Sequence, residues 1–351
     1  MTISRAASCG VGALAAIISV AAASFTPATA ADQVNIYSYR EPGLIAPLLK
    51  AFEEKTGIKP NVVFARDGLI ERAAAEGANS PMDVLLTVDI ARLMEAETRG
   101  ISQPVNSEAV NANIPANYRD PEGHWVGFSQ RARIVYASKE RVKQDSITYE
   151  ELADPKWKGK ICTRSGQSSY NIALLASIIA HSGVEKAEAW ARGLKENLAR
   201  KPAGGDRDQV KAVYSGECDL AIGNTYYMAA MQTNTQKPEQ QEWANSVRIL
   251  FPNADDRGTH VNITGAVLGK YAPNKEAGIK LIEFLTSEEG QKIYAEIVNE
   301  YPLKKGVPIS DRVASWGPLK ADPLPLEEIA KHSAEASAII DRVGFDSGGG
   351  N

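Results

Sequence analysis

The sequence has few side chains of the kinds that soft metals bind. Its 351 residues include 3 cysteines and 4 histidines. Zinc and copper prefer sulfur and imidazole ligands, so the composition argues against either metal as the main ligand of this protein. Acidic pairs such as Asp255-Asp256 lack the loop spacing of a calcium site, and we interpret them as solvated turn residues.

Sequence motifs of common exported enzymes are also missing. The chain has no Gly-x-Ser-x-Gly elbow and no His-Glu-x-x-His, and the single plausible cysteine nucleophile, Cys162, has a candidate partner in Cys218. The histidines are scattered, so we expect no enzyme. Basic residues are scattered too and the formal net charge is −4, so we expect no nucleic-acid partner.

Long apolar runs are absent beyond the first 30 residues. Arg5 and the small-residue apolar stretch 11–23 are typical of a secretory signal, and Ala28-Thr29-Ala30 fits its cleavage rule. The apolar stretch is too short for a good membrane anchor. We therefore expect residues 1–30 to be a signal peptide cleaved after Ala30, and a product that is exported to the periplasm without membrane insertion.

Two cysteines remain after that cleavage, Cys162 and Cys218. In an oxidising compartment an even pair favours a disulfide, and the alternative is two buried free thiols. A bond would tie the segment before Tyr170 to the segment before Tyr226.

Alternating strand and helix patterns predict an α/β fold. Strand-like segments at 34–39, 60–64 and 83–87 alternate with helical spacing between them, which implies a mostly parallel sheet. The strand-like segment 128–136 is a plausible crossing to a second lobe, and 261–268 a plausible return.

Tyrosines lie where predicted strands give way to helices. Tyr226 and Tyr227 follow the apolar strand 219–222, and Tyr170 follows strand 160–162 and a polar turn. Ligands of open α/β sheets bind at this edge. A phenolate is a hard anionic oxygen whose pKa falls beside a highly charged cation, so adjacent phenols suit ferric iron. The alternative is one core ring and one rim ring.

Eight segments of the chain, in their order, resemble a known family. They are 34–40, 56–58, 83–89, 130–133, 168–171, 223–227, 260–265 and 286–291. Together they span nearly the whole chain after residue 30, and they resemble the periplasmic ferric-iron-binding proteins of ABC importers, which are class II-like periplasmic binding proteins. The specific part is the late pair Tyr226-Tyr227 with Tyr170 in the earlier turn.

The resemblance implies a two-lobed fold. Each lobe would be a mostly parallel sheet flanked by helices, with the ligand cleft between the lobes. Lobe 1 would take residues 31–130 and about 260–310, and lobe 2 residues 131–259 and about 311–351.

The resemblance also implies the metal ligands. By position, Tyr170, Tyr226 and Tyr227 correspond to the tyrosines that hold Fe³⁺ in this family. Many members add a histidine or tyrosine from the turn after the first strand. This chain has Glu41-Pro42 there, so Tyr39 beside it becomes a further candidate.

Relatives without that histidine complete the iron's coordination with carbonate or another small anion bound by arginine. Arg40 and Arg131 are the candidates for this role here, and Arg133 is a less favoured one. An alternating strand would point Arg131 and Arg133 to the same face, so their order alone does not separate them.

The implied function is capture of ferric iron, free or as a chelate, and its delivery to the permease and ATPase subunits of an ABC importer by a monomeric binding protein. The first alternative is an importer subunit for another solute, such as a polyamine, thiamine or an organic anion. The second is an exported enzyme.

Overall fold

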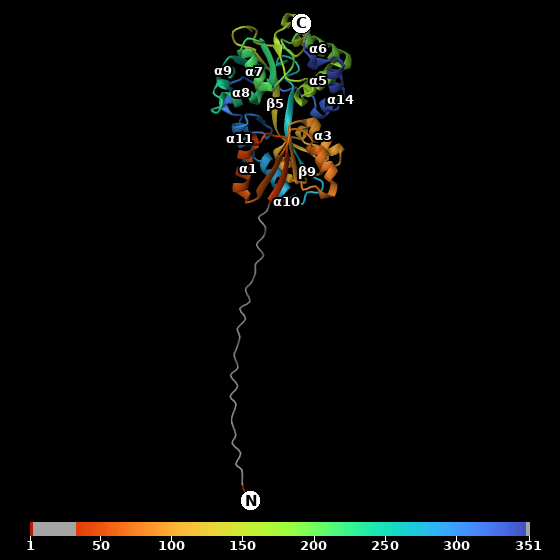
Figure 1. Ribbon diagram of the computed structural model, residues 1–351, viewed down its shortest axis with the longest axis vertical. Coiled ribbons are helices and arrows are strands. Elements are labelled where there is room, and N and C mark those ends of the chain that lie inside the picture. The colour runs from red at the N-terminus through yellow and green to blue at the C-terminus, as the bar shows by residue number, and fades with distance from the viewer. Residues whose placement is uncertain (3–32, 349–351) are drawn as a thin grey trace. The chain divides into compact units, whose positions relative to one another are not determined.

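Strand β5 (Val126–Ser138) joins two groups of strands in one 10-stranded sheet, and the fold is arranged around it. The computed structural model describes residues 1–2 and 33–348, and those from 33 onward belong to one compact unit (Figure 1). The predicted signal peptide, residues 1–30, therefore lies outside the described residues except for its first two. No helix in the described part is long and apolar enough to cross a membrane.

The strands follow one path in the order β2-β1-β3-β9-β5-β7-β6, with β8 and β10 beside β5 and β4 beside β9. The pairs β1–β2, β1–β3 and β6–β7 are parallel, and the pairs β3–β9, β9–β5 and β5–β7 are antiparallel. Their bounds are β1 (Gln33–Ser38), β2 (Lys59–Phe64), β3 (Val84–Thr87), β4 (Ser102–Gln103), β6 (Ile161–Cys162), β7 (Leu220–Asn224), β8 (Val247–Leu250), β9 (Val261–Gly269) and β10 (Tyr301–Pro302).

The prediction of an α/β fold is confirmed, but the sheet is mixed rather than mostly parallel. β5 leads the chain out of the first group of strands and β9 brings it back. A strand that returns beside the one by which the chain left runs the opposite way, so β5 and β9 pair antiparallel. Both predicted crossing segments, 128–136 and 261–268, lie within these two strands.

β5 changes partner close to the predicted lobe boundary. Ala132 pairs with Val261 on β9, and the next residue, Arg133, pairs with Asn224 on β7. The residues on either side of this change thus pair with different groups of strands. The assignment of the chain to two lobes stays a prediction.

Helices cover both groups of strands. Figure 1 shows α1, α3 and α10 gathered around one end of the path, and α5, α7 and α9 around the other. The helices are α1 (Pro42–Thr56), α2 (Leu69–Glu76), α3 (Ile90–Thr98), α4 (Glu108–Asn113), α5 (Ser169–Ser182), α6 (Val184–Glu196), α7 (Asp206–Tyr214), α8 (Thr225–Gln232), α9 (Glu239–Asn245), α10 (Lys275–Thr286), α11 (Glu288–Ile297), α12 (Asp311–Ala314), α13 (Leu326–Ala330) and α14 (Ser333–Arg342).

The central strand β9 is buried along its whole length, which explains its near-continuous apolar sequence. Gly265 in its middle lets helix α3 pack closely. A Cβ atom at Gly265 would lie 2.6 Å from Cδ1 of Leu93 and 2.8 Å from the carbonyl oxygen of Val126. Any larger residue would push α3 away from the sheet.

The tyrosines occupy the strand-to-helix junctions that the sequence predicts. β7 ends at Asn224 and α8 begins at Thr225, so Tyr226 and Tyr227 lie in the first turn of α8. Tyr170 lies in the first turn of α5. The first turns of two helices therefore carry all three phenols.

Cys162 on β6 and Cys218 just before β7 form a disulfide, with their Cα atoms 5.9 Å apart. This agrees with the prediction of a bond rather than two free thiols. Since β6 and β7 are neighbours in the sheet, the bond reinforces the strands that lead toward Tyr170 and Tyr226.

We expect the double variant Cys162→Ala/Cys218→Ala to lose about 2–5 kcal/mol of unfolding free energy, because the bond closes a loop with a sequence separation of 56 residues. Urea unfolding of the chain from Ala31 onward, followed by circular dichroism, measures this. Parent protein kept in reductant is the matched control and should lose a similar amount. Two titratable thiols in the unfolded, unreduced parent would contradict the bond.

Candidate metal centre

Tyr170, Tyr226 and Tyr227 lie together. The hydroxyl oxygens of Tyr170 and Tyr226 are 3.2 Å apart, and the ring centroids of Tyr226 and Tyr227 are 4.3 Å apart at an interplanar angle of 33°. Tyr226 is buried, with 3% of its surface exposed, and the other two are half-buried. The structure thus brings together the three tyrosines that the sequence singles out, from helices that are far apart in the chain.

Tyr226 and Tyr227 are strongly disfavoured as anions in the ligand-free protein. Burial raises the pKa of Tyr226 well above its usual value, and the neighbouring Tyr170 and Tyr227 raise it further. Burial also raises the pKa of Tyr227, again with Tyr170 as a contributor. Both side chains are therefore neutral at pH 7, and a nearby positive charge is needed to ionise them.

Arginines surround this cluster of rings. Each has its guanidinium carbon 4.8–5.9 Å from the centroid of one of the three rings; they are Arg40, Arg131, Arg133, Arg164 and Arg207. This positive charge favours negative charge at the tyrosine cluster. The negative charge can come from a bound anion or from ionised tyrosines.

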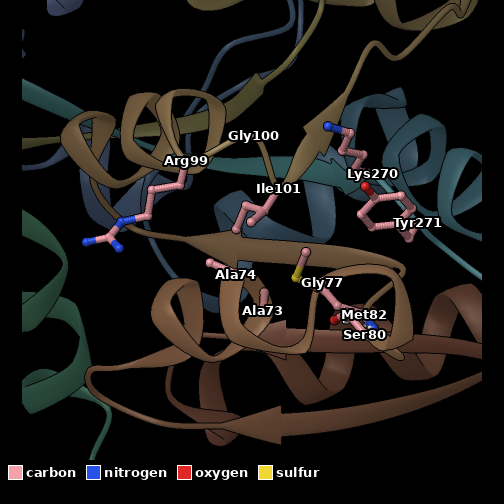
Figure 2. A pocket seen from close by; sticks show the side chains of 10 residues that line it. All are labelled: Ala73, Ala74, Gly77, Ser80, Met82, Arg99, Gly100, Ile101, Lys270 and Tyr271. Atoms are coloured by element: carbon pink, nitrogen blue, oxygen red, sulfur yellow. Dashed lines mark hydrogen bonds between the residues drawn. The ribbon is translucent and has the colours of Figure 1, made fainter.

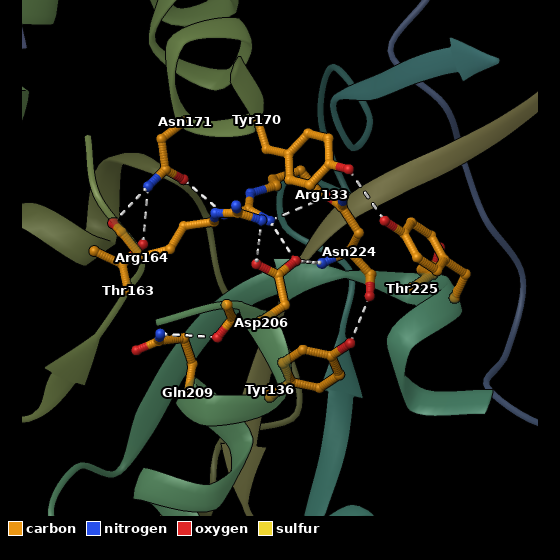
Figure 3. A network of polar contacts seen from close by, with 12 residues as sticks. Arg133, Tyr136, Thr163, Arg164, Tyr170, Asn171, Asp206, Gln209, Asn224 and Thr225 are labelled. Atoms are coloured by element: carbon orange, nitrogen blue, oxygen red, sulfur yellow. Dashed lines mark hydrogen bonds and ion pairs between the residues drawn. The ribbon is translucent and has the colours of Figure 1, made fainter. Parts of the chain in front are cut away.

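Arg133 donates from both of its terminal nitrogens in a buried network (Figure 3). Its Nη1 atom donates to Oδ2 of Asp206 at 2.9 Å and to Oδ1 of Asn224 at 3.1 Å, and its Nη2 atom donates to Oδ1 of Asn171 at 2.7 Å. Asp206 also accepts a hydrogen bond from the backbone amide of Asn224 at 2.9 Å. Asn171 follows Tyr170 and Asn224 precedes α8, so one guanidinium links both tyrosine-bearing turns.

Arg131 differs from Arg133 in having no such partners. Its side chain is 2% exposed, and neither Nη1 nor Nη2 has a hydrogen-bond partner within the described part of the chain. Asp89 and Glu300 act on it only as more distant charges. Burial raises the pKa of Asp89 and Arg131 opposes that shift; burial also acts to raise the pKa of Glu300, but Arg40 and Arg131 contribute to lowering it. A buried guanidinium with free N–H groups is suited to bind an anion.

Arg131 lines a small cavity of about 10 Å³, with Arg133, Tyr170, Ala173, Asn224, His260 and Asn262. The predicted common face of Arg131 and Arg133 is thus confirmed. His260, which the sequence leaves among scattered histidines, is also buried there. Burial, followed by the charges of Arg131 and Arg133, lowers its pKa to about 3, so its imidazole stays neutral.

Arg40, the second predicted anion ligand, is already paired. Its Nη2 atom donates to Oε1 of Glu300 and to Oγ1 of Thr264, both at 2.6 Å. Glu300 is fully buried, and its Oε2 accepts from Ser129 and Thr264. Burial raises the pKa of Glu300, but Arg40, Arg131 and the hydrogen bond from Ser129 together leave it below its usual value. Arg40 is therefore less available to an anion than Arg131.

The hydroxyl of Tyr39 has a hydrogen-bond partner of its own, on helix α2. Its hydroxyl accepts a hydrogen bond from the backbone amide of Ile70 at 3.0 Å, and the guanidinium of Arg92 lies 4.0 Å from its ring centroid. Its hydroxyl is thus occupied at the start of α2. It is the weakest of the four tyrosine candidates.

Four members of the site are not predicted by any sequence pattern: Asp206, Asn171, Asn224 and Glu300. Each is polar and buried, which is expensive without partners. The partners that define the network are remote, up to 260 residues away along the chain for Glu300, so no local pattern could reveal them.

A larger cavity, of about 170 Å³, lies elsewhere. It is lined by Ala73, Ala74, Gly77, Ser80, Met82, Arg99, Gly100, Ile101, Lys270 and Tyr271. Figure 2 shows the guanidinium of Arg99 turned away from the small and apolar side chains of this group. Arg99 bonds instead to Glu95. This cavity lacks convergent ligand atoms, and we assign it no ligand.

Comparisons with known proteins identify the family. A model of bacterial extracellular solute-binding proteins matches residues 79–320. The chain belongs to this family. Its relatives are solute-binding proteins rather than enzymes, which confirms the expectation that the chain is no enzyme.

Three similar proteins carry names that concern iron. Iron uptake protein A1 of Synechocystis sp. is 45% identical over 90% of this chain and 88% of its own length. The apo ferric ion-binding protein A of Pasteurella haemolytica superimposes with a TM-score of 0.86 at 49% identity, covering 90% of this chain and 99% of its own. A Trichodesmium protein in complex with iron and citrate ligands has a TM-score of 0.83 at 46% identity, covering 89% and 99%. The resemblance found in the sequence is thereby confirmed.

Arg131 and the Arg40–Glu300 pair should differ in their contribution to the stability of the fold. We expect Arg131→Met to cost about 1 kcal/mol of unfolding free energy or less, because it removes a buried charge that has no hydrogen bonds. Glu300→Gln should cost about 3–5 kcal/mol, since it leaves Arg40 buried without its counter-ion. Urea unfolding of the ligand-free proteins at pH 7 measures both. Equal losses would show that Arg131 is stabilised by groups other than those described.

Proposed function

We propose that this protein captures ferric iron outside the cytoplasm and delivers it to an ABC importer. The observation that carries the proposal is the cluster of Tyr170, Tyr226 and Tyr227, with hydroxyls 3.2 Å apart in the closest pair, beside the unpaired guanidinium of Arg131. The names of the relatives support the same cargo.

Three phenolates match the formal charge of Fe³⁺. They leave coordination positions for a small bidentate anion such as carbonate, or for a chelator such as citrate. Arg131 is our candidate for that anion, because its terminal N–H groups are free and a guanidinium binds carboxylate-like anions through two parallel hydrogen bonds. Arg40 instead lies 5.4 Å from the centroid of the Tyr226 ring, where its charge partly opposes the burial that raises the pKa of that phenol.

The small cavity beside Arg131, about 10 Å³, would not admit an iron ion together with an anion. We therefore propose that the two predicted lobes open and close around the site by bending of β5 and β9, the strands along which the chain passes from one lobe to the other. The predicted lobes are 31–130 with about 260–310, and 131–259 with about 311–351. Arg133 at the change of partner in β5 stays attached to the tyrosine-bearing turns.

Delivery requires partners and a location. We propose that residues 1–30 direct export to the periplasm and are removed after Ala30. The mature monomer would then dock on the permease of an importer driven by its ATPase subunits.

The first test of this function replaces single hydroxyls. We expect Tyr226→Phe and Tyr227→Phe each to lower ferric affinity by more than about a hundredfold, because changes outside the ligand shell already cost about 10–100-fold. The visible phenolate-to-iron band should shift or vanish, while urea unfolding stays near that of the parent. Affinity is measured by competition with citrate.

Tyr39→Phe is the matched control. Its hydroxyl binds the amide of Ile70, so its removal should leave the band and the ferric affinity near those of the parent. If Tyr226→Phe and Tyr227→Phe both bound ferric iron as tightly as the parent and kept its colour, the iron site would be wrong. Binding of another solute, such as an organic anion, would then be the better-supported function.

Iron binding should release protons. Tyr226 and Tyr227 are protonated at pH 7 in the ligand-free protein because their pKa values are raised, and coordination requires their anions. Affinity therefore falls as pH falls. Titration calorimetry in buffers of different ionisation enthalpy, with one ferric chelate throughout, should show about one proton fewer for Tyr227→Phe than for the parent. An equal release from both proteins would exclude Tyr227 as a ligand.

A further inference from the structure

A second group of metal-ligating side chains lies outside the tyrosine cluster. Glu97 near the end of α3, and Glu122 and His124 in the loop before β5, place one ligand atom each within 4.8 Å of the others. Glu97 and His124 are half-buried and Glu122 is exposed. The group shares no residue with the tyrosine cluster or its arginines.

The imidazole of His124 is held in a fixed orientation. Its Nδ1 atom lies 2.8 Å from the hydroxyl oxygen of Ser102, a residue of β4 that is 5% exposed. This leaves Nε2 available to a metal. Histidine ligands of metal sites characteristically have their second ring nitrogen bound in this way, which fixes the tautomer and the direction of the ring.

The loop that carries two of the ligands is ordered without any ion. Asp120, which is 8% exposed, accepts hydrogen bonds on Oδ2 from the backbone amides of Glu122 at 3.0 Å and His124 at 2.8 Å. Both side chains therefore start from one anchored turn, and little further ordering is needed when a ligand binds.

Negative charge is left uncompensated at this place. Among the described residues, none of Asp120, Glu97, Glu122 and Glu327 forms an ion pair with a lysine, arginine or histidine, although many more exposed carboxylates elsewhere do, such as Asp67 and Glu54. This uncompensated charge is a second reason, independent of the spacing, to expect a cation.

We propose that Glu97, Glu122 and His124 form a site for a divalent transition-metal ion of the Zn²⁺ type, with water in the remaining position. Imidazole is a poor ligand for Ca²⁺ and Mg²⁺, which prefer oxygen, whereas a histidine with carboxylates suits Zn²⁺. Bonds of about 2.0–2.2 Å hold ligand atoms about 3–4 Å apart, so a small movement of the exposed Glu122 completes the site.

The site lies beside a helix that connects it to the rest of the fold. Helix α13 packs against both α3 and α5. An ion that binds the folded protein and not the unfolded chain stabilises the fold by mass action. We therefore expect Zn²⁺ to stabilise the protein against heat as well as to bind.

The test uses Zn²⁺ alone with the tag-free chain from Ala31 onward, free of iron. Competition with a chromophoric chelator should show one specific Zn²⁺ ion, and His124→Ala and Glu97→Gln should each weaken it about tenfold or more. Zn²⁺ should raise the unfolding temperature of the parent but not that of the two variants. His332→Ala removes an imidazole outside the group and should bind Zn²⁺ like the parent.

Two further measurements separate this site from the iron site. The double variant Tyr226→Phe/Tyr227→Phe should keep Zn²⁺ binding, and His124→Ala should keep the ferric band. Circular dichroism in the presence of a chelator verifies that each variant is folded. No binding by the parent at about 0.1 mM Zn²⁺, or parent-like binding by both His124→Ala and Glu97→Gln, would overturn the proposal.

Discussion

The buried pair of Arg133 and Asp206 is the interaction on which the geometry of the tyrosine cluster depends. Arg133 bonds to Asn171, beside Tyr170, and to Asn224, just before α8. Asp206 accepts from both Arg133 and the amide of Asn224. Two helix starts that are remote in sequence are thus fixed to one point of β5. Both charges are buried. Without Arg133, Asp206 would keep Arg164 at 3.4 Å, whereas without Asp206 the guanidinium of Arg133 would have no carboxylate partner.

The difference between paired and unpaired arginines gives this site its chemistry. Arg133 and Arg40 have carboxylate partners and act as structural groups. Arg131 retains free N–H groups in a buried position, which is a costly arrangement in a protein without a ligand. In our proposal an anion satisfies these groups when the iron is bound. The same charge would also help to ionise phenols whose pKa values are otherwise raised by burial.

Much of this arrangement is predictable from the sequence, and the rest is not, for physical reasons. The junctions before Tyr170 and Tyr226 follow from local patterns, as does the disulfide from cysteine count, and the structure contains all of them. The direction of β9 depends on the path of the chain between residues 139 and 260, which no local pattern reports. The sheet was therefore predicted as mostly parallel.

The roles of the arginines were beyond sequence analysis for a related reason. The resemblance makes Arg40 an anion candidate, and no local pattern indicates that Glu300, 260 residues away, is its partner. Tyr39 was an iron candidate because it precedes a turn, but the direction of its hydroxyl depends on the packing of α2. Alternation along β5 puts Arg131 and Arg133 on one face, and only their neighbours on other elements distinguish a structural arginine from a free one.

Anomalous diffraction at the iron absorption edge, from crystals of the protein loaded with ferric iron, tests the central claim most directly. The account predicts one strong peak bonded to the hydroxyl oxygens of Tyr170, Tyr226 and Tyr227, with an anion between the iron and the guanidinium of Arg131. A peak at any other place, or iron bonded to none of these phenolic oxygens, would contradict it.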